Sequence, residues 1–195
     1  MRPSTRSLLA GAGATAVAAA LAAAPALPAQ AHGGEGRQVQ VRDECEHVSF
    51  DEALFPGACD PAFGGGVTFG QLLQELHADP AEVLAKREVL GWRFNPDETQ
   101  AEAGDVLVLT SRGGEGHTFT EVPAFGGGCV EEVNVVMGLG VHPLCAVEED
   151  GMPGPDWLST FIAPGATMTT PALTEGTHHF ECLIHPWMRT TVTVG

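Results

Sequence analysis

Hydrophobic residues recur at every second position in several short stretches of the chain, a pattern that predicts half-buried β-strands. Trp92 and Phe94 alternate with polar neighbours, and residues 190–194 place valines on one face and threonines on the other. The stretch 106–110 is apolar on both faces, which favours a central strand. Short strands separated by glycine, proline and asparagine turns are typical of a β-sandwich or barrel.

Residues 68–87 follow a different pattern, with the period of an amphipathic helix. Apolar side chains between positions 69 and 76 have the i, i+3, i+4, i+7 spacing, and Thr68 and Gln71 have the spacing of a capping box. Asp79 and the proline that follows it are a second helix start. This stretch therefore predicts two short helices that pack against the core.

The first 31 residues have the composition of an export signal. Arg2 and Arg6 precede an apolar, alanine-rich run, and residues 29–31 have the small-x-small form that signal peptidase cleaves. The run is short for a membrane anchor. We expect cleavage after Ala31, a secreted, periplasmic or cell-envelope exterior location, and no stable membrane insertion once the signal is removed.

The chain is strongly acidic, with 25 Asp and Glu against 9 Lys and Arg and a formal net charge of −16 over 195 residues. Because phosphate contacts need clustered basic side chains, this balance argues against a nucleic-acid partner, and it argues equally against an anionic membrane surface. A hydrophobic content of 44% argues against a disordered acidic chain. The charge could steer a partner with a basic docking surface, although solubility alone would explain it equally well.

Three residues of metal-binding type lie within seven positions near the C-terminus: Cys182, His185 and Met188. A thiolate, an imidazole and a thioether suit copper better than calcium or magnesium. Cys182 ends one predicted strand and Met188 precedes the next, so a tight loop can turn all three toward one point. His117 opens a strand after the glycine-rich turn 113–116 and is the best candidate for a fourth ligand. Zinc is the chemical competitor, but methionine is a poor zinc ligand.

The Cys-x-x-His-x-x-Met loop and the Val-Thr-Val strand after it resemble the cupredoxin family, and the short loop is similar to that of its amicyanin-like members. The resemblance implies an all-β fold, a Greek-key β-sandwich over residues 91–195, in which residues 32–90 form an N-terminal elaboration with one or two short helices. It also implies one type 1 (blue) copper ion with four ligands, namely His117, Cys182, His185 and Met188.

Two positions depart from the family pattern. Many cupredoxins carry an asparagine after the first histidine ligand that ties the two ligand segments together, whereas this chain has Thr118, whose hydroxyl could do the same. The ligands His117 and Cys182 are also far apart in sequence, with the extra length around residues 129–156. By the resemblance, His185 would be partly exposed, and Pro186 and Trp187 beside it would form either an apolar docking patch or part of the packing.

The five cysteines are an odd number, which a single thiolate ligand would explain. The other four allow three disulfide pairings, of which we expect the two local ones, Cys45–Cys59 and Cys129–Cys145. Each would stabilise the fold by about 3 kcal/mol on the chain-entropy account. His142, inside the second loop, is expected to be exposed, and His47 and His77 are expected to be surface residues.

These features make a one-electron carrier the leading hypothesis. The alternative is an extracytoplasmic module for copper storage or delivery. Two features favour it, namely the glycine-rich N-terminus with His32 and the insertion at 125–156. An enzyme is not expected, because four protein ligands leave no open position for a substrate. Oxidases with a trinuclear centre place histidines on both sides of the cysteine, whereas Cys182 is flanked by Glu181 and Leu183.

Overall fold

The computed structural model of the chain describes residues 36–145 and 155–195. The predicted export signal, its cleavage position, His32 and residues 146–154 of the insertion lie outside these ranges. Among the helices of the described ranges, none has both the length and the apolar character that a membrane crossing requires.

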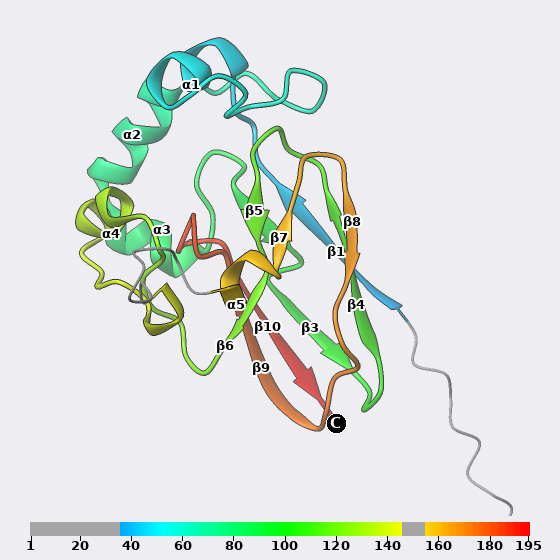
Figure 1. Cartoon of the computed structure of the whole chain (residues 1–195). Coiled ribbons are helices and arrows are strands. Elements are labelled where there is room, and N and C mark those ends of the chain that lie inside the picture. Colours follow the sequence, from blue (N-terminus) through cyan, green and yellow to red (C-terminus); the bar gives the residue numbers. More distant parts are fainter. Residues whose placement is uncertain (1–35, 146–154) are drawn as a thin grey trace, which may run out of the picture. The chain divides into compact units, whose positions relative to one another are not determined.

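Two four-stranded sheets form the framework (Figure 1). The first has the order β2-β1-β4-β8, in which β1 is antiparallel to β2 and parallel to β4. Its strands are β1 (Gly36–Arg42), β2 (Arg93–Asn95), β4 (Val106–Ser111) and β8 (Thr167–Thr169). The second has the order β3-β10-β9-β6, with β3 (Glu98–Ala101), β10 (Arg189–Val194), β9 (Gly176–Glu181) and β6 (Thr120–Val122). A two-stranded ladder joins β5 (His117–Thr118) to β7 (Phe161–Ile162).

The inner faces of the two sheets share one apolar core. Val39 and Leu109 from the first sheet and Phe180 and Val192 from the second are all buried in it. An aromatic series connects the sheets, because the ring of Phe119 lies 4.9 Å from that of Phe94 in β2 and 4.5 Å from that of Phe180 in β9. This is the packing of a β-sandwich, as the alternating pattern predicted.

The predicted central strand is confirmed, since β4 lies between β1 and β8. Its side chains alternate between buried and partly buried, with Leu107 and Leu109 facing the core. Strand β1 precedes residue 90 and yet is hydrogen-bonded along its length to β4, with Val39 opposite Leu109. The segment that the sequence assigns to an N-terminal elaboration therefore supplies a core strand.

Both predicted helices are present, as α2 (Phe69–Ala78) and α3 (Pro80–Lys86). The capping box is complete at Thr68 and Gln71, and the Asp79 carboxylate accepts the backbone N–H of Glu82. Three further helices and a 3-10 turn were not predicted: α1 (His47–Ala53), α4 (Glu131–Met137), α5 (Pro155–Leu158) and the turn Pro143–Cys145. The expected all-β class is therefore corrected to a β-sandwich with helices, while the Greek-key connectivity stays a prediction.

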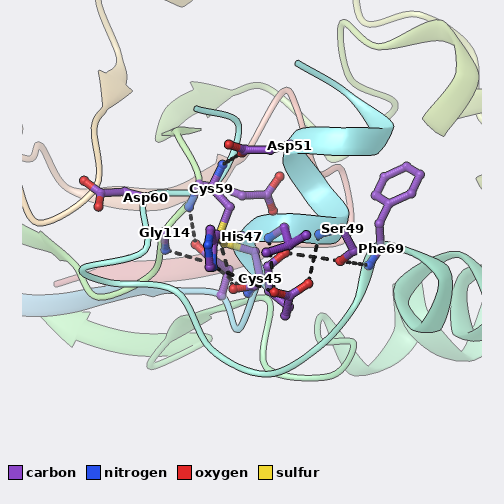
Figure 2. Close-up of a disulfide and its surroundings, with 12 residues drawn as sticks. Cys45, His47, Ser49, Asp51, Cys59, Asp60, Phe69 and Gly114 are labelled. Carbon is purple, nitrogen blue, oxygen red and sulfur yellow. Dashed lines mark hydrogen bonds and ion pairs between the residues drawn. A yellow bond between two sulfur atoms is a disulfide. The ribbon is translucent and has the colours of Figure 1, made fainter. Parts of the chain in front are cut away.

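Both expected disulfides are confirmed, Cys45–Cys59 and Cys129–Cys145, and Cys182 is the free cysteine of the described chain. The first disulfide is fully buried beneath α1 and beside Gly114 (Figure 2). The helix α1 is capped by Glu46, whose carboxylate accepts the backbone N–H groups of Val48 and Ser49. A loop rich in acidic residues thus contains a helix because one of its acids caps it.

Candidate metal centre

The predicted ligands come from two places in the fold. His117 is the first residue of β5, directly after the glycine-rich turn. Cys182 directly follows β9, and His185 and Met188 lie in the turn before β10. The turn is closed by its own backbone, because Met188 N–H donates to His185 O at 2.8 Å and Cys182 N–H donates to Met188 O at 3.0 Å.

Three side chains converge on one point. The Nδ1 atoms of His117 and His185 are 3.2 Å apart, and Cys182 Sγ lies 3.9 Å from the first and 3.7 Å from the second. Nitrogen and sulfur ligands lie about 2.0–2.3 Å from a bound zinc or similar ion, so neighbouring ligand atoms of one ion are about 3–4 Å apart. The three donor atoms therefore fit a single metal ion, and their thiolate and imidazole chemistry fits copper.

The site is closed to solvent. His117 and Cys182 are fully buried and His185 is 6% exposed. Met188 is also fully buried and joins the group through its backbone hydrogen bonds to His185 and Cys182. The structure thus brings together three of the four predicted ligands as a donor cluster, and Met188 as the axial ligand stays a prediction.

Thr118 ties the two ligand segments together. Its hydroxyl oxygen accepts the backbone N–H of Leu183 at 2.7 Å, and its own backbone N–H donates to Cys182 Sγ at 3.4 Å. The departure from asparagine at this position therefore keeps the connection between β5 and the β9–β10 turn. The N–H donation to sulfur also favours the thiolate form of Cys182.

The His117 ring is anchored on its other side by Asp43, a residue that the sequence reasoning missed. His117 Nε2–H donates to Asp43 Oδ2 at 2.8 Å, with both side chains fully buried. Burial by itself would lower the pKa of His117, but the hydrogen bonds to Asp43 and Cys182 outweigh it and raise the pKa to about 10. No spacing rule links positions 43 and 117, so no local signal could have identified this contact.

The Cys182 thiol is poised to lose its proton. Burial by itself would raise its pKa, but hydrogen bonds from His117 and His185 and their charges hold the pKa well below its ordinary value. Since the thiolate is the form that binds a metal, the neighbouring imidazoles prepare the sulfur for coordination.

Glu115 is a second buried carboxyl group beside the site. Its Oε2 accepts Trp92 Nε1–H at 2.6 Å and lies 3.6 Å from His185 Nε2, which is too long for a hydrogen bond. Burial raises the pKa of Glu115, and the nearby histidines offset this only in part. The imidazoles of His117 and His185 therefore differ in their outer contacts, since of these two only His117 is hydrogen-bonded to a carboxylate.

The expected exposure of His185 is wrong, and Pro186 and Trp187 form part of the packing. Both are buried, Trp187 to 1% exposure, and the indole ring lies 5.3 Å from that of His185. The backbone from Gly126 to Cys129 contacts the turn, where Cys129 N–H donates to Leu183 O at 2.6 Å. A side chain at Gly128 would overlap Leu183 O, so the insertion and the turn are in close contact.

The expected exposure of His142 is also wrong, because it is 7% exposed. Its backbone N–H donates to Gly128 O, and its Nδ1 accepts Leu144 N–H at 3.2 Å at the start of the 3-10 turn. His142 therefore packs inside the second disulfide loop rather than on the surface. The expectations for His47 and His77 are confirmed, since both are exposed.

No protein-family model matches the sequence, and no curated protein matches it either. Among solved structures, the chain is similar to a purple cupredoxin from Nitrosopumilus maritimus, with 13% identity, a TM-score of 0.38, and coverage of 82% of this chain and 99% of that one. It is also similar to a Cu(I) form of a mutant amicyanin (15% identity, TM-score 0.33, 53% of this chain and 73% of that one). A third similar structure is oxidised plastocyanin from Dryopteris crassirhizoma, with 23% identity, a TM-score of 0.31, and coverage of 53% of this chain and 89% of that one.

All three of these similar structures are cupredoxins, the family that the C-terminal motif resembles. At these TM-scores the superposition is loose, so the metal centre of this chain rests on its own side-chain geometry.

Proposed function

We propose that this chain is an exported type 1 copper protein that carries single electrons. The observation that carries the proposal is the enclosed cluster of His117 Nδ1, Cys182 Sγ and His185 Nδ1, with mutual distances of 3.2–3.9 Å. Two imidazoles and one thiolate, with a methionine as the fourth and weaker ligand, form the blue-copper arrangement. Copper bound there would supply one-electron chemistry between Cu(II) and Cu(I).

Each residue has a separate task in this proposal. Cys182 provides the thiolate, and His117 and His185 provide Nδ1 atoms in fixed positions. Because the pKa of His117 is raised to about 10, metal binding would release the proton from its Nδ1. Thr118 holds the two segments at a constant separation through its bond to Leu183 N–H. Because the ligands are held by buried contacts, little movement of the protein accompanies a change in metal charge, which favours fast electron transfer.

The closure of the site favours a carrier over a storage or delivery module. Delivery requires that an acceptor reach the metal and replace the ligands one by one, whereas His117 and Cys182 are fully buried and His185 is 6% exposed. The same closure leaves no path for a substrate to a metal at this position. We therefore propose a non-enzymatic role, in which only electrons cross the protein surface.

The partner in this proposal is a redox protein with a basic docking surface. The net charge of −16 would attract such a partner within about one Debye length of the surface, and the association rate would fall as salt is added. The two disulfides support export, since such bonds persist in oxidising compartments.

The deciding experiment is to load the protein with Cu(II) and to record its visible and EPR spectra. We expect a blue or purple protein with an intense thiolate-to-copper band that disappears in Cys182→Ala and His117→Ala. His47→Ala, which removes an exposed imidazole, is the matched control and should retain the band. A colourless wild-type protein, or colour that survives Cys182→Ala, would contradict the proposal.

A second measurement separates the carrier from the delivery module. A carrier should show a reversible potential and a fast electron self-exchange rate, and should lose copper slowly to a chelator. Rapid copper loss combined with slow self-exchange would favour delivery instead.

A further inference from the structure

Asp43 is a buried carboxylate on the opposite side of the His117 ring from the metal-donor atom. Its Oδ2 accepts His117 Nε2–H at 2.8 Å and Glu115 N–H at 3.2 Å. Its Oδ1 accepts Gly114 N–H at 2.9 Å and Cys45 N–H at 3.3 Å. A carboxylate has acceptor positions for all four donors, so every hydrogen bond at this point is satisfied.

The carboxylate is held in place by the turn before β5 and by the first disulfide. A side chain at Gly113 would overlap the Asp43 carboxylate, and a Cβ at Gly114 would lie 2.7 Å from Cys45 Sγ and 2.8 Å from Cys59 Sγ. Asp60 N–H donates to Gly114 O at 2.7 Å (Figure 2). The glycine turn is therefore closely packed between the Asp43 carboxylate and the disulfide.

This contact determines which nitrogen of His117 faces the donor cluster. With the Nε2–H bound to Asp43, the Nδ1 atom points to Cys182 Sγ and His185 Nδ1. In metal sites, a carboxylate on the outer nitrogen of an imidazole ligand fixes the ring orientation and makes the ligand more basic. A buried negative charge near a metal also favours the more highly charged ion.

We propose that Asp43 is a positioning residue of the metal centre, which acts through His117 to orient its Nδ1 and to favour the oxidised over the reduced metal. Only the second part of this proposal, the preference for the oxidised metal, rests on the proposed copper function. It also assigns a task to the segment before residue 90, which supplies this anchor directly after β1.

His185 provides a comparison within the same molecule. The nearest carboxylate, Glu115 Oε2, is 3.6 Å from its Nε2 and is already hydrogen-bonded to Trp92. We therefore expect the two ligand imidazoles to differ, with a strong outer hydrogen bond for His117 and none to a carboxylate for His185.

The first test uses the wild-type protein loaded with Zn²⁺ as a diamagnetic probe, with NMR detection of the imidazole N–H protons. The expected result is an Nε2–H signal for His117 that is shifted downfield and protected from exchange with water, whereas that of His185 is not shifted in this way. A His117 Nε2–H that exchanges as fast as that of an exposed histidine would overturn the proposal. This readout needs neither copper nor a variant.

The second test compares Asp43→Asn with Asp51→Asn. Asparagine has one acceptor oxygen where aspartate has two, so the first variant leaves two of the four donors around position 43 unpaired. Asp51 accepts Gly57 N–H at 2.9 Å and Cys59 N–H at 3.2 Å and so braces the same disulfide loop without touching an imidazole. It is therefore the matched control for a general loosening of this loop.

For Asp43→Asn we expect Cu(II) affinity to fall about 10- to 100-fold, with a smaller fall in Cu(I) affinity. Each tenfold selective loss of Cu(II) affinity raises the one-electron potential by about 59 mV. Asp51→Asn should leave the potential unchanged. A potential that stays constant in Asp43→Asn, or that shifts equally in Asp51→Asn, would overturn the electronic half of the proposal.

The two proposals fail in different ways. A wild-type protein without a thiolate-to-copper band would end the copper function, while the zinc NMR signal would still decide whether Asp43 orients His117. If Asp43→Asn does not fold, the wild-type signal alone decides: a protected His117 Nε2–H supports the positioning role, and its absence contradicts it.

Discussion

The two sides of the metal centre are held by different means. On the β5 side, the Asp43 carboxylate accepts the Nε2–H of His117, and the glycine turn that binds this carboxylate packs against the disulfide Cys45–Cys59. On the side of the β9–β10 turn, the backbone of Leu183 is hydrogen-bonded to Thr118 and to Cys129, and Leu183 packs in an apolar cluster with the disulfide Cys129–Cys145.

This difference shows that ring orientation and packing of the turn are provided by separate parts of the fold. Orientation of an imidazole needs a directional acceptor, and Asp43 supplies one. The position of the turn backbone needs a second segment packed against it, and the backbone from Gly126 onward supplies one through its contacts with Leu183. We therefore expect damage on the first side to change the properties of the metal, and damage on the second side to change how long it is retained.

The largest effect should come from Arg189→Ala, which removes a side chain that binds both Gly126 and Glu181. Arg189 donates to Gly126 O at 2.7 Å and to Glu181 Oε1 at 3.1 Å, where Glu181 is fully buried. Loss of one partner of a buried ion pair costs about 3–5 kcal/mol. Chemical denaturation at pH 8 should show a fall of this size. Arg93→Ala, whose partner Glu88 is substantially exposed, should cost about 1 kcal/mol or less.

The cost of Arg189→Ala should also depend on pH. Burial raises the pKa of Glu181 from 4.5 to about 7, although Gly126 N–H and Arg189 partly oppose it. Between these values the native state binds more protons than the unfolded state, so the free energy of unfolding falls as pH rises. Without Arg189 the pKa of Glu181 should rise further, so the pH range over which stability falls extends to higher pH. The variant should therefore lose less stability at pH 5 than at pH 8, and equal losses would contradict the ion-pair account.

Removal of each disulfide tests the comparison directly. The double variants Cys45→Ala/Cys59→Ala and Cys129→Ala/Cys145→Ala should each lose about 3 kcal/mol in the free energy of unfolding. Only the first should alter the copper absorption band, since only this disulfide packs against the turn that positions His117. The second should retain the band but lose copper faster to a chelator. The same spectral change in both would show that the two sides do not differ.

A smaller effect is expected for Thr118→Val, which keeps the shape of the side chain but removes the acceptor for Leu183 N–H. Both residues are fully buried, and an unsatisfied buried donor costs about 1–3 kcal/mol. Denaturant unfolding should report this loss. Thr118→Ser retains the hydroxyl and should recover most of the stability, so equal losses in the two variants would argue against the hydrogen bond.

The smallest loss of stability is expected for Met188→Leu, since volume-conserving changes in a core cost less than about 1.5 kcal/mol. The colour should remain and the potential should rise, because an axial methionine only tunes the metal. Voltammetry and visible spectra on the same sample measure both. Complete loss of copper would contradict a weak axial role.

Local features of the chain were predictable because they depend on neighbours in sequence. Cys182, His185 and Met188 fall in one turn between two alternating strands, so their spacing alone places them at one end of a hairpin. The helices α2 and α3 follow from their capping residues, and the disulfides from the short separations of 14 and 16 residues.

The remaining features depend on contacts that no spacing encodes. The bond between Asp43 and His117 spans 74 positions, and it exists because β1 pairs in parallel with β4 and so brings the end of β1 next to the turn before β5. The hydrogen bond from Cys129 N–H to Leu183 O depends likewise on where the insertion folds back. The helix α4 (Glu131–Met137), which lies in that insertion, begins without a side-chain cap and left no signal.

The sequence by itself therefore determined the donor chemistry: one unpaired thiol, with an imidazole and a thioether in the same loop and a second imidazole upstream. Only the tertiary structure decided the surroundings of these donors, namely a carboxylate behind one histidine, the burial of the other beside Trp187 and a threonine that ties the two ligand segments together. The physical reason is that ligand type is a property of single side chains, whereas solvent exclusion and ring orientation arise from segments that meet only when the two sheets and the insertion pack together.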